Sequence, residues 1–338
     1  MKKTKKLLKF LICVVIIAIV WPIISLGAEF ISLTSYNGDD IEFQVEQGAF
    51  ASDVAADLEE LGVIKSKYTF LARLKLMPDE KSSIYHGTHI ISKGMSLGDV
   101  LKEVTTMPEA DDTLTFSIPE GYSVDMIAKK AEKEGLCTYD EFIHSVKNDS
   151  FDYEFIKHIP DADYRYKLEG FLFPDTYEFF KDDGAHEIID KMLSVFEREY
   201  KKYFSGYDDM FRLVTIASMV EREAALEEEC PRIAGVISNR LEKDMLLQID
   251  ATVVYAKSSG RYDIPVLSYA DLEVASPYNT YLNGGLPLGP ICNPGVKAIR
   301  AAASPEKHEW LYYHTDDQKA DGSHIFTKTF DEHIATMN

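Results

Sequence analysis

The sequence predicts an α+β protein with an N-terminal transmembrane helix, a small α/β module and a larger, mostly helical domain that ends in a C-terminal hairpin. Three observations predict this arrangement: an uncharged apolar stretch over 10–28, a repeated strand–turn–helix pattern over 40–106, and long helical patterns beyond residue 113. The 338 residues are enough for about two domains. A hydrophobic fraction of 46% and a charged fraction of 27% are typical of a globular chain and exclude a disordered or collagen-like one.

The charge of the chain is acidic overall and unevenly placed. The formal net charge is −20, which argues against a nucleic-acid partner because a polyanion would be repelled. The first nine residues instead carry five lysines and no acid. Clustered lysines stay on the cytoplasmic side of a membrane, so residues 1–9 are predicted to be a cytoplasmic tail.

Residues 10–28 form the uncharged stretch that follows directly. As a helix these 19 residues span about 28 Å, close to the thickness of the hydrocarbon layer. The stretch is therefore predicted to be a single-pass membrane anchor, with the rest of the protein outside the cytoplasm. A cleaved signal peptide is the alternative, since Ser25, Gly27 and Ala28 are small enough for a cleavage site.

A strand–turn–helix pattern occurs three times in the first part of the chain. The copies span 43–62, 89–104 and 116–135, and each helical stretch ends on or near a glycine or a polar break. Because one such unit cannot bury its apolar face alone, we expect the copies to pack together. General α+β packing and a glycan-binding module are both compatible with this pattern.

The polar, proline-containing stretch over 107–113 is the predicted domain boundary, which separates a module at 40–106 from a domain at 113–338. The sequence contains neither GxGxxG nor GxxxxGK[ST], so a nucleotide loop is not expected. The larger domain shows helical patterns at 139–148, 186–203, 208–226, 231–243 and 295–303, and a hairpin from 310–314 to 324–329.

Metal and disulfide chemistry are not expected. Three cysteines lie beyond the anchor without CxxC spacing, so one bridge at most can form among Cys137, Cys230 and Cys292. The histidines near the C-terminus lack the HExxH spacing of a zinc site, and packing in the hairpin is their expected role. No metal and no cofactor are predicted.

Glu221 is the strongest candidate for chemistry. It follows a stretch over 213–220 that is apolar or small throughout and predicts a helix buried on most sides. At about 100° per residue, the face of Glu221 carries small side chains, which leaves room for a substrate. Burial favours the neutral carboxyl that a general acid needs. A solvated or salt-bridged acid is the alternative interpretation, and Glu223, on the opposite side, is expected to be structural.

Three further segments carry aromatic and polar side chains that suit a sugar ligand, although core packing, helix capping and loop ordering would explain them equally well. The acidic run over 227–229, just before Pro231, is expected to be a solvated cluster at a helix start. The binding candidates are Glu169 and Tyr177 in 168–177, Asn239, Gln248 and Asp250 in 239–252, and Tyr278 and Asn279 in the loop over 276–295.

Seven segments, in order along the chain, resemble the YceG-like family, the endolytic murein transglycosylases. They are LEGFLFPDTYEF (168–179), ASMVEREA (217–224), VISNRLEKDMLLQIDATVVYA (236–256), SPYNTY (276–281), GLPLGPICNPG (285–295), AIRAAASP (298–305) and GSHIFTKTFDEH (322–333). The resemblance implies cleavage of the β-1,4 bond after N-acetylmuramic acid in nascent peptidoglycan strands, with a 1,6-anhydro product end. It also implies that 113–338 is the catalytic domain, that Glu221 is its catalytic acid and base, that 40–106 is LysM-like, and that cell-wall synthesis proteins such as penicillin-binding proteins are partners.

Two alternatives stay open at this point. One is a non-catalytic wall-binding scaffold of the synthesis complex. The other is a muramidase that uses water, which needs a second carboxylate such as Glu169, Glu223 or Asp250. A lytic transglycosylase needs one carboxylate, because the C6 hydroxyl of the substrate is the nucleophile and is already close to the reacting carbon.

Overall fold

The structure is a computed structural model that describes residues 27–31, 35–46, 49–77, 83–106, 113–181, 183–204 and 206–337. The chain divides into two compact units, Met1–Asp111 and Asp112–Asn338. The predicted cytoplasmic tail at 1–9 and nearly all of the predicted anchor at 10–28 lie outside the described residues. Among the residues that are described, no helix has both the length and the apolar character required to span a bilayer.

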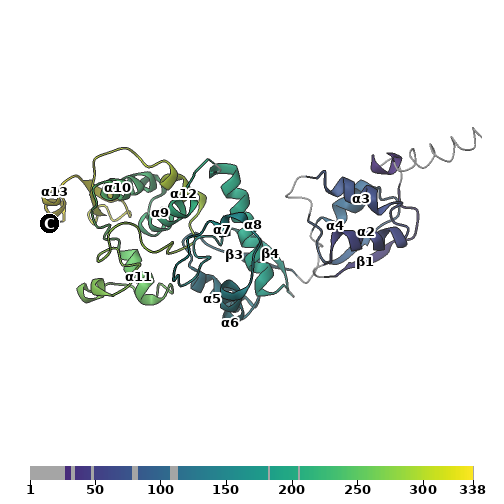
Figure 1. The fold of residues 1–338 in the computed structure, drawn as a ribbon, viewed down its shortest axis with the longest axis horizontal. Helices are drawn as coiled ribbons and strands as arrows, with labels where there is room; N and C mark the ends of the chain where they lie inside the picture. Colours follow the sequence, from purple (N-terminus) through teal and green to yellow (C-terminus); the bar gives the residue numbers. More distant parts are fainter. Residues whose placement is uncertain are drawn as a thin grey trace, which may run out of the picture. The chain divides into compact units, whose positions relative to one another are not determined.

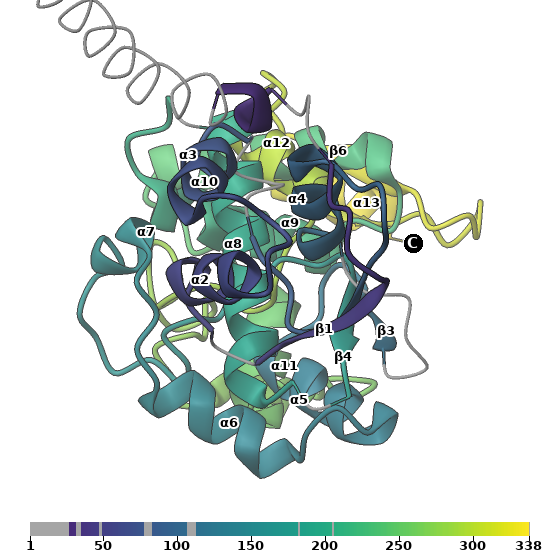
Figure 2. The same cartoon turned by 90° about the vertical axis from the view of Figure 1, so that its right-hand side faces the viewer.

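In its described residues, the first unit contains a two-stranded antiparallel sheet, a short helical turn at 27–30 and three longer helices. Strand β1 (Ile41–Val45) pairs with β2 (Gly87–Ile91), so that Ile41 lies opposite Ile91. The helices are α2 (Ala51–Glu60), α3 (Lys67–Leu74) and α4 (Leu97–Val104), seen beside β1 in Figure 1 and from a second side in Figure 2. Their apolar faces meet in one core around Leu58, Phe70 and Val100. The first two strand–turn–helix copies are thereby confirmed as elements that pack together, and α3 is an element that the sequence pattern missed.

The third copy belongs to the other unit, so the expectation that all three copies pack together is wrong. Its strand β3 (Thr113–Ser117) pairs with β4 (Thr176–Phe180), and its helix α5 (Val124–Glu134) ends on Gly135 in a left-handed conformation. The physical reason is aromatic packing: Phe116 is fully buried opposite Tyr177 and against Phe179. The repeat pattern describes each local unit correctly but carries no information about its strand partner.

The five helices predicted for the larger unit are present, and so is the hairpin. The helix with Glu221 ends earlier than predicted, because Ala224 already has an extended backbone. The elements are α6 (Tyr139–Asn148), α8 (Ala185–Phe204), α9 (Met210–Glu223), α10 (Cys230–Glu242), α12 (Val296–Ala303), β5 (Tyr312–Thr315) and β6 (His324–Thr327). Elements not predicted are α7 (Glu154–Lys157), α11 (Asp250–Ser258), α13 (Phe330–Thr336) and the short 3₁₀ helices η2 (Glu227–Glu229) and η3 (Tyr269–Glu273).

Helix α9 lies at the centre of the larger unit and is buried along almost its whole length, as predicted. All residues from Leu213 to Val220 are buried. It packs against α10 and α12 (Figure 1). Helix α12 presents buried alanines such as Ala298, Ala301 and Ala302. These short side chains let the two helices approach closely. The end of α9 therefore reaches the start of α12.

A close approach at Gly170 fixes the loop over 285–295 to the core. Gly170 has a φ of +93°, and a Cβ atom there would lie 2.6 Å from Pro290 and 2.8 Å from Val214. Only glycine tolerates both the backbone conformation and this contact. Nearby, the Ser218 hydroxyl on α9 accepts the Ile291 N–H at 3.1 Å, so α9 holds the same loop from a second side.

We expect Gly170→Ala to lower the free energy of unfolding by about 3 kcal/mol, because it adds overpacking to backbone strain. Gly135→Ala is the matched control, since Gly135 also has a positive φ but nothing lies within 4 Å of its added Cβ. The control should cost about 1 kcal/mol. Urea denaturation followed by near-UV circular dichroism measures both values, and equal losses would contradict the contact.

Candidate active site

Glu221 lies in the last turn of α9, with its side chain directed at the first residue of α12. Its Oε2 accepts the Gly295 N–H at 3.1 Å, and Gly295 is the N-cap of α12. The positive end of that helix favours the carboxylate, but burial favours the neutral acid. Burial is the larger effect and raises the pKa of Glu221 above its usual range, while the Gly295 hydrogen bond opposes it. The group is thus suited to hold a proton and still be stable as an anion.

A second carboxylate lies close to the first one. Glu120 follows β3 in an exposed turn, and a Cβ atom added to Gly295 would overlap its carboxylate. Its negative charge further raises the pKa of Glu221. The next residue, Gly121, has a φ of +80°, and a Cβ there would lie 3.5 Å from the Cγ of Glu221. The turn over 119–121 therefore forms one wall of the site and brings in a carboxylate that the sequence analysis missed.

Two cations lie near Glu221. The Arg222 guanidinium stacks on the Tyr262 ring at 3.9 Å, and its Nη1 lies 3.5 Å from the Gly121 carbonyl. Lys297, in the first turn of α12, pairs with Glu227. Both charges lower the pKa of Glu221, but by less than burial raises it.

The nearby thiols are neutral and do not supply a nucleophile. Burial and the charge of Glu221 raise the pKa of Cys230 to about 11 and that of the fully buried Cys292 well above its usual value. A neutral thiol is a poor nucleophile. Within the described residues Cys137, Cys230 and Cys292 are all free thiols.

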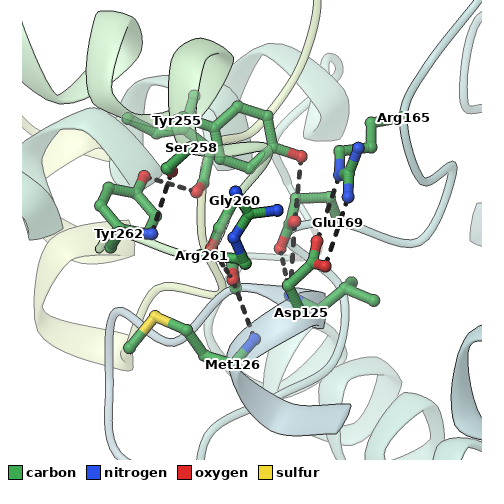
Figure 3. Close-up of polar contacts among 12 residues, drawn as sticks. Asp125, Met126, Arg165, Glu169, Tyr255, Ser258, Gly260, Arg261 and Tyr262 are labelled. Carbon is green, nitrogen blue, oxygen red and sulfur yellow. Dashed lines mark hydrogen bonds and ion pairs between the residues drawn. The ribbon is translucent and has the colours of Figure 1, made fainter. Parts of the chain in front are cut away.

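Glu169, a predicted binding residue, is buried and fully engaged in hydrogen bonds. Its carboxylate accepts the Val124 N–H at 3.0 Å, the Tyr255 hydroxyl at 3.0 Å and the Asn293 side-chain amide at 3.2 Å. Figure 3 shows Tyr255 of α11 directed at it. Burial raises the pKa of Glu169 to about 8. It joins the start of α5 to α11 and to the loop that carries Gly295.

An ion pair beside Glu169 completes the buried polar cluster. Arg165 Nε donates to Asp125 Oδ2 at 3.1 Å (Figure 3). The Tyr139 hydroxyl donates to Asp125 Oδ1 at 2.6 Å. Asp125 is fully buried, and these partners satisfy the hydrogen-bonding capacity of its side chain. The sequence analysis missed both members of this pair, since a single Asp in the first turn of a helix is usually solvated.

Asn293 has the most complete hydrogen bonding in this region. Its Oδ1 accepts the N–H groups of Gly170 and Leu172, both at 2.9 Å. Its Nδ2 donates to the Tyr122 carbonyl at 2.9 Å and to Glu169. The side chain thus joins its own loop to two other segments, and this fixes the position of the Gly295 N–H two residues later. The only sequence signal was its place within the segment GLPLGPICNPG.

The other predicted binding residues fall into two groups. Tyr177, Tyr278 and Asn279 are buried, and Asn239 is occupied by the carbonyls of His308 and Trp310 at 2.9 Å each. Gln248 and Asp250 have exposed side chains at the start of α11, where Asp250 accepts the Tyr281 hydroxyl. Contact of any of the seven with a ligand stays a prediction. The four buried or engaged side chains bond or pack against neighbouring segments of the larger unit, and the other two are exposed.

Glu223 and Glu229 attach the C-terminal hairpin to the helices. The Tyr313 hydroxyl donates to Glu223 at 2.9 Å, in agreement with the structural role expected for it. The expectation of a solvated cluster is wrong for Glu229, which is 4% exposed and lies 2.6 Å from His324 Nδ1. It also accepts the His324 N–H, which explains why an acid is buried there. Glu227 and Glu228 are exposed as expected.

Comparison with known proteins identifies relatives over most of the chain. A sequence profile of the YceG-like family matches residues 43–338. The endolytic murein transglycosylase of Streptococcus pneumoniae serotype 2 (strain D39) is 32% identical over 299 residues, which are 80% of this chain and 53% of that protein. The endolytic murein transglycosylase of Bacillus subtilis (strain 168) is 32% identical over 309 residues, which cover 87% of this chain and 82% of that protein.

A solved structure is similar as well. The crystal structure of a YceG-like protein from Listeria monocytogenes matches with a TM-score of 0.59 and 30% identity, and covers 89% of this chain and 99% of that one. The chain spans about half the length of the pneumococcal relative and most of the length of the Bacillus one.

We expect Asn293→Asp to lower the free energy of unfolding by about 3 kcal/mol at pH 9, because a new carboxylate would face Glu169 and the Tyr122 carbonyl. The loss should be smaller at pH 5, where Glu169 is protonated. Asn283→Asp is the control, since Asn283 donates to two carbonyls at an exposed site. Denaturant unfolding at both pH values is the measurement, and a pH-independent loss would contradict the assigned contact.

Proposed function

We propose that this chain, which belongs to the YceG-like family, is an endolytic lytic transglycosylase of peptidoglycan with Glu221 as its catalytic acid and base. The observation that carries the proposal is the raised pKa of Glu221 at the end of a buried helix, together with the Gly295 N–H that can stabilise its anion. The names of the pneumococcal and Bacillus relatives support the same activity.

The reaction follows from the two protonation states of one carboxyl group. Protonated Glu221 donates its proton to the glycosidic oxygen, and the bond from that oxygen to the anomeric carbon of N-acetylmuramic acid breaks. The Glu221 carboxylate then takes the proton of the C6 hydroxyl, whose oxygen bonds to the anomeric carbon. The products are a free hydroxyl on the leaving sugar and a 1,6-anhydro end, and Glu221 is protonated again.

A muramidase that uses water is the second candidate, because a second carboxylate lies beside the first. Of the acids first considered for this role, Glu169 is buried in its own hydrogen bonds and Glu223 is bonded to Tyr313. The third, Asp250, accepts the Tyr281 hydroxyl at the start of α11. Glu120 is exposed and packs on the same glycine that binds Glu221, which makes it the better base for a water molecule. The two reactions leave different product ends.

The glycan-binding residues are part of the same proposal. The exposed Gln248 and Asp250 are the direct contacts, since amide and carboxylate groups bond sugar hydroxyls. The other five residues act indirectly, by holding the loops and the β-strand that border the glycan-binding surface. They are Glu169, Tyr177, Asn239, Tyr278 and Asn279.

The cellular setting follows from the sequence. Residues 10–28 anchor the chain, the lysine-rich tail stays in the cytoplasm, and the catalytic unit acts outside on nascent glycan strands. The small unit is the LysM-like module, and penicillin-binding proteins are the expected neighbours, because they make the strands that the enzyme cuts.

Glu221→Gln should abolish cleavage, with a loss of about 1,000-fold or more, because glutamine cannot donate and recover the proton. The protein should stay folded and still bind glycan. Glu228→Gln is the control, because Glu228 is an exposed glutamate that, like Glu221, precedes Pro231 in the sequence. Mass spectrometry of products from uncrosslinked strands gives both the rate and the end group.

Each result of that measurement separates the candidates. Internal fragments with 1,6-anhydro-N-acetylmuramic acid ends establish the transglycosylase. Reducing ends would indicate the muramidase with Glu120. No cleavage by the folded wild-type protein would contradict both enzymes and favour the scaffold.

Glu120→Gln should move the alkaline limb of the pH–rate profile to lower pH. The active form carries a protonated Glu221, so activity falls as the pH rises through the pKa of that group. Removing the negative charge of Glu120 lowers this pKa. Rate measurements across the pH range test this, with Glu228→Gln as the control, and an unchanged limb would contradict the electrostatic coupling of the two acids.

A further inference from the structure

One side of α3 in the small unit presents apolar and basic side chains to solvent. Tyr68 is 74% exposed and Leu76 is 73% exposed, although both side chains are large and mostly or wholly apolar. At about 100° per residue, Ala72 and Lys75 fall on the same side as these two, and both are exposed. Lys65, which precedes the extended N-cap Ser66 and is not part of the helix, is exposed as well. The opposite side of the helix, with Phe70 and Leu74, is buried in the core. We call the five exposed residues the α3 face.

The charge of this segment is opposite to that of the protein. Residues 61–77 contain four basic residues, at 65, 67, 73 and 75, and no acid, whereas the whole chain has a net charge of −20. Of the acids near α3, Glu29 is buried, Glu59 accepts the backbone N–H of Lys67 at 3.2 Å, and Asp99, which is near Arg73, accepts the Ser96 N–H at 2.8 Å. A basic surface with an exposed tyrosine and leucine is typical of a helix that lies at a lipid interface.

The short helical turn at 27–30, at the outer end of the predicted anchor, is attached to the same helix. Glu29 is 2% exposed, and its carboxylate accepts the Thr69 hydroxyl at 2.9 Å and the Lys65 N–H. Arg73 donates to the Phe30 carbonyl. Figures 1 and 2 both show this short helix next to α3. The first residues after the predicted anchor are thus held against α3 by three hydrogen bonds.

We propose that the α3 face lies on the anionic lipid surface of the membrane in which residues 10–28 are anchored. The proposal rests on the anchor put forward under the proposed function. Because Glu29 fixes the end of the anchor to α3, the helix lies within a few residues of the bilayer and cannot move far from it. Lysine side chains then meet anionic headgroups, and Tyr68 and Leu76 enter the interface. The small unit would be held at one height and orientation where nascent strands emerge.

Hydrogen exchange of the full chain in nanodiscs tests this surface. The chain is reconstituted in phosphatidylcholine alone and in phosphatidylcholine with phosphatidylglycerol, and exchange is followed over residues 65–76. We expect exchange to be about tenfold slower with phosphatidylglycerol. Lys65→Glu combined with Lys75→Glu should remove the difference. Lys129→Glu combined with Lys133→Glu, two exposed lysines on α5, makes the same change of net charge and should keep it.

The results separate the surface from the anchor on which it depends. Whether the chain is recovered with the nanodiscs tests the anchor alone. Exchange of each variant in discs of phosphatidylcholine alone shows whether that variant is folded. Equal exchange of α3 in both lipids, in a chain that is anchored, would overturn the proposal and leave the α3 face to a protein partner. The proposal would also be overturned if the α5 control lost the difference in α3 exchange between the two lipids. The net charge of the chain, rather than the α3 face, would then cause the slower exchange.

Discussion

The buried side chain of Asn293 determines the geometry of the candidate active site. It accepts two backbone N–H groups from 170–172 and donates to Tyr122 and Glu169, so three segments far apart in sequence meet at one amide. Gly295, two residues later, takes its position from this arrangement and donates to Glu221. The close contact of Gly170 with Pro290 depends on the same segments. A buried amide is costly unless every one of its groups is bonded, and here each one is.

The surroundings of Glu221 both raise and lower its pKa. Burial and the charge of Glu120 favour the neutral acid, whereas Gly295, Arg222 and Lys297 favour the anion. A group that must give up a proton and recover it within one reaction needs both forms to be accessible. The end of a buried helix next to the start of another helix supplies this balance.

The sequence predicted local structure well and long-range contacts poorly. The helical periodicity of 213–220 correctly predicted a buried helix with Glu221 at its end. Composition gave no sign that β3 pairs with β4, because strand partners depend on which side chains fit across the sheet. Glu229 looked like a solvated acid, since its partner His324 is distant in sequence. Glu120 was missed for the same reason: its role depends on the Gly295 backbone, which no local pattern contains.

The placement of Glu221 and Gly295 has a consequence for the order of folding. The contacts of the small unit join residues between 29 and 104, so this unit can fold as soon as that part of the chain has been made. The Glu221 carboxylate, in contrast, acquires its N–H donor only when residue 295 is present, and Glu120 meets that glycine across a still longer loop. Long loops close slowly and late. A chain that is still being synthesised therefore has the Glu221 carboxyl in place before its N–H donor, and the candidate site is complete only after residue 295 has been made.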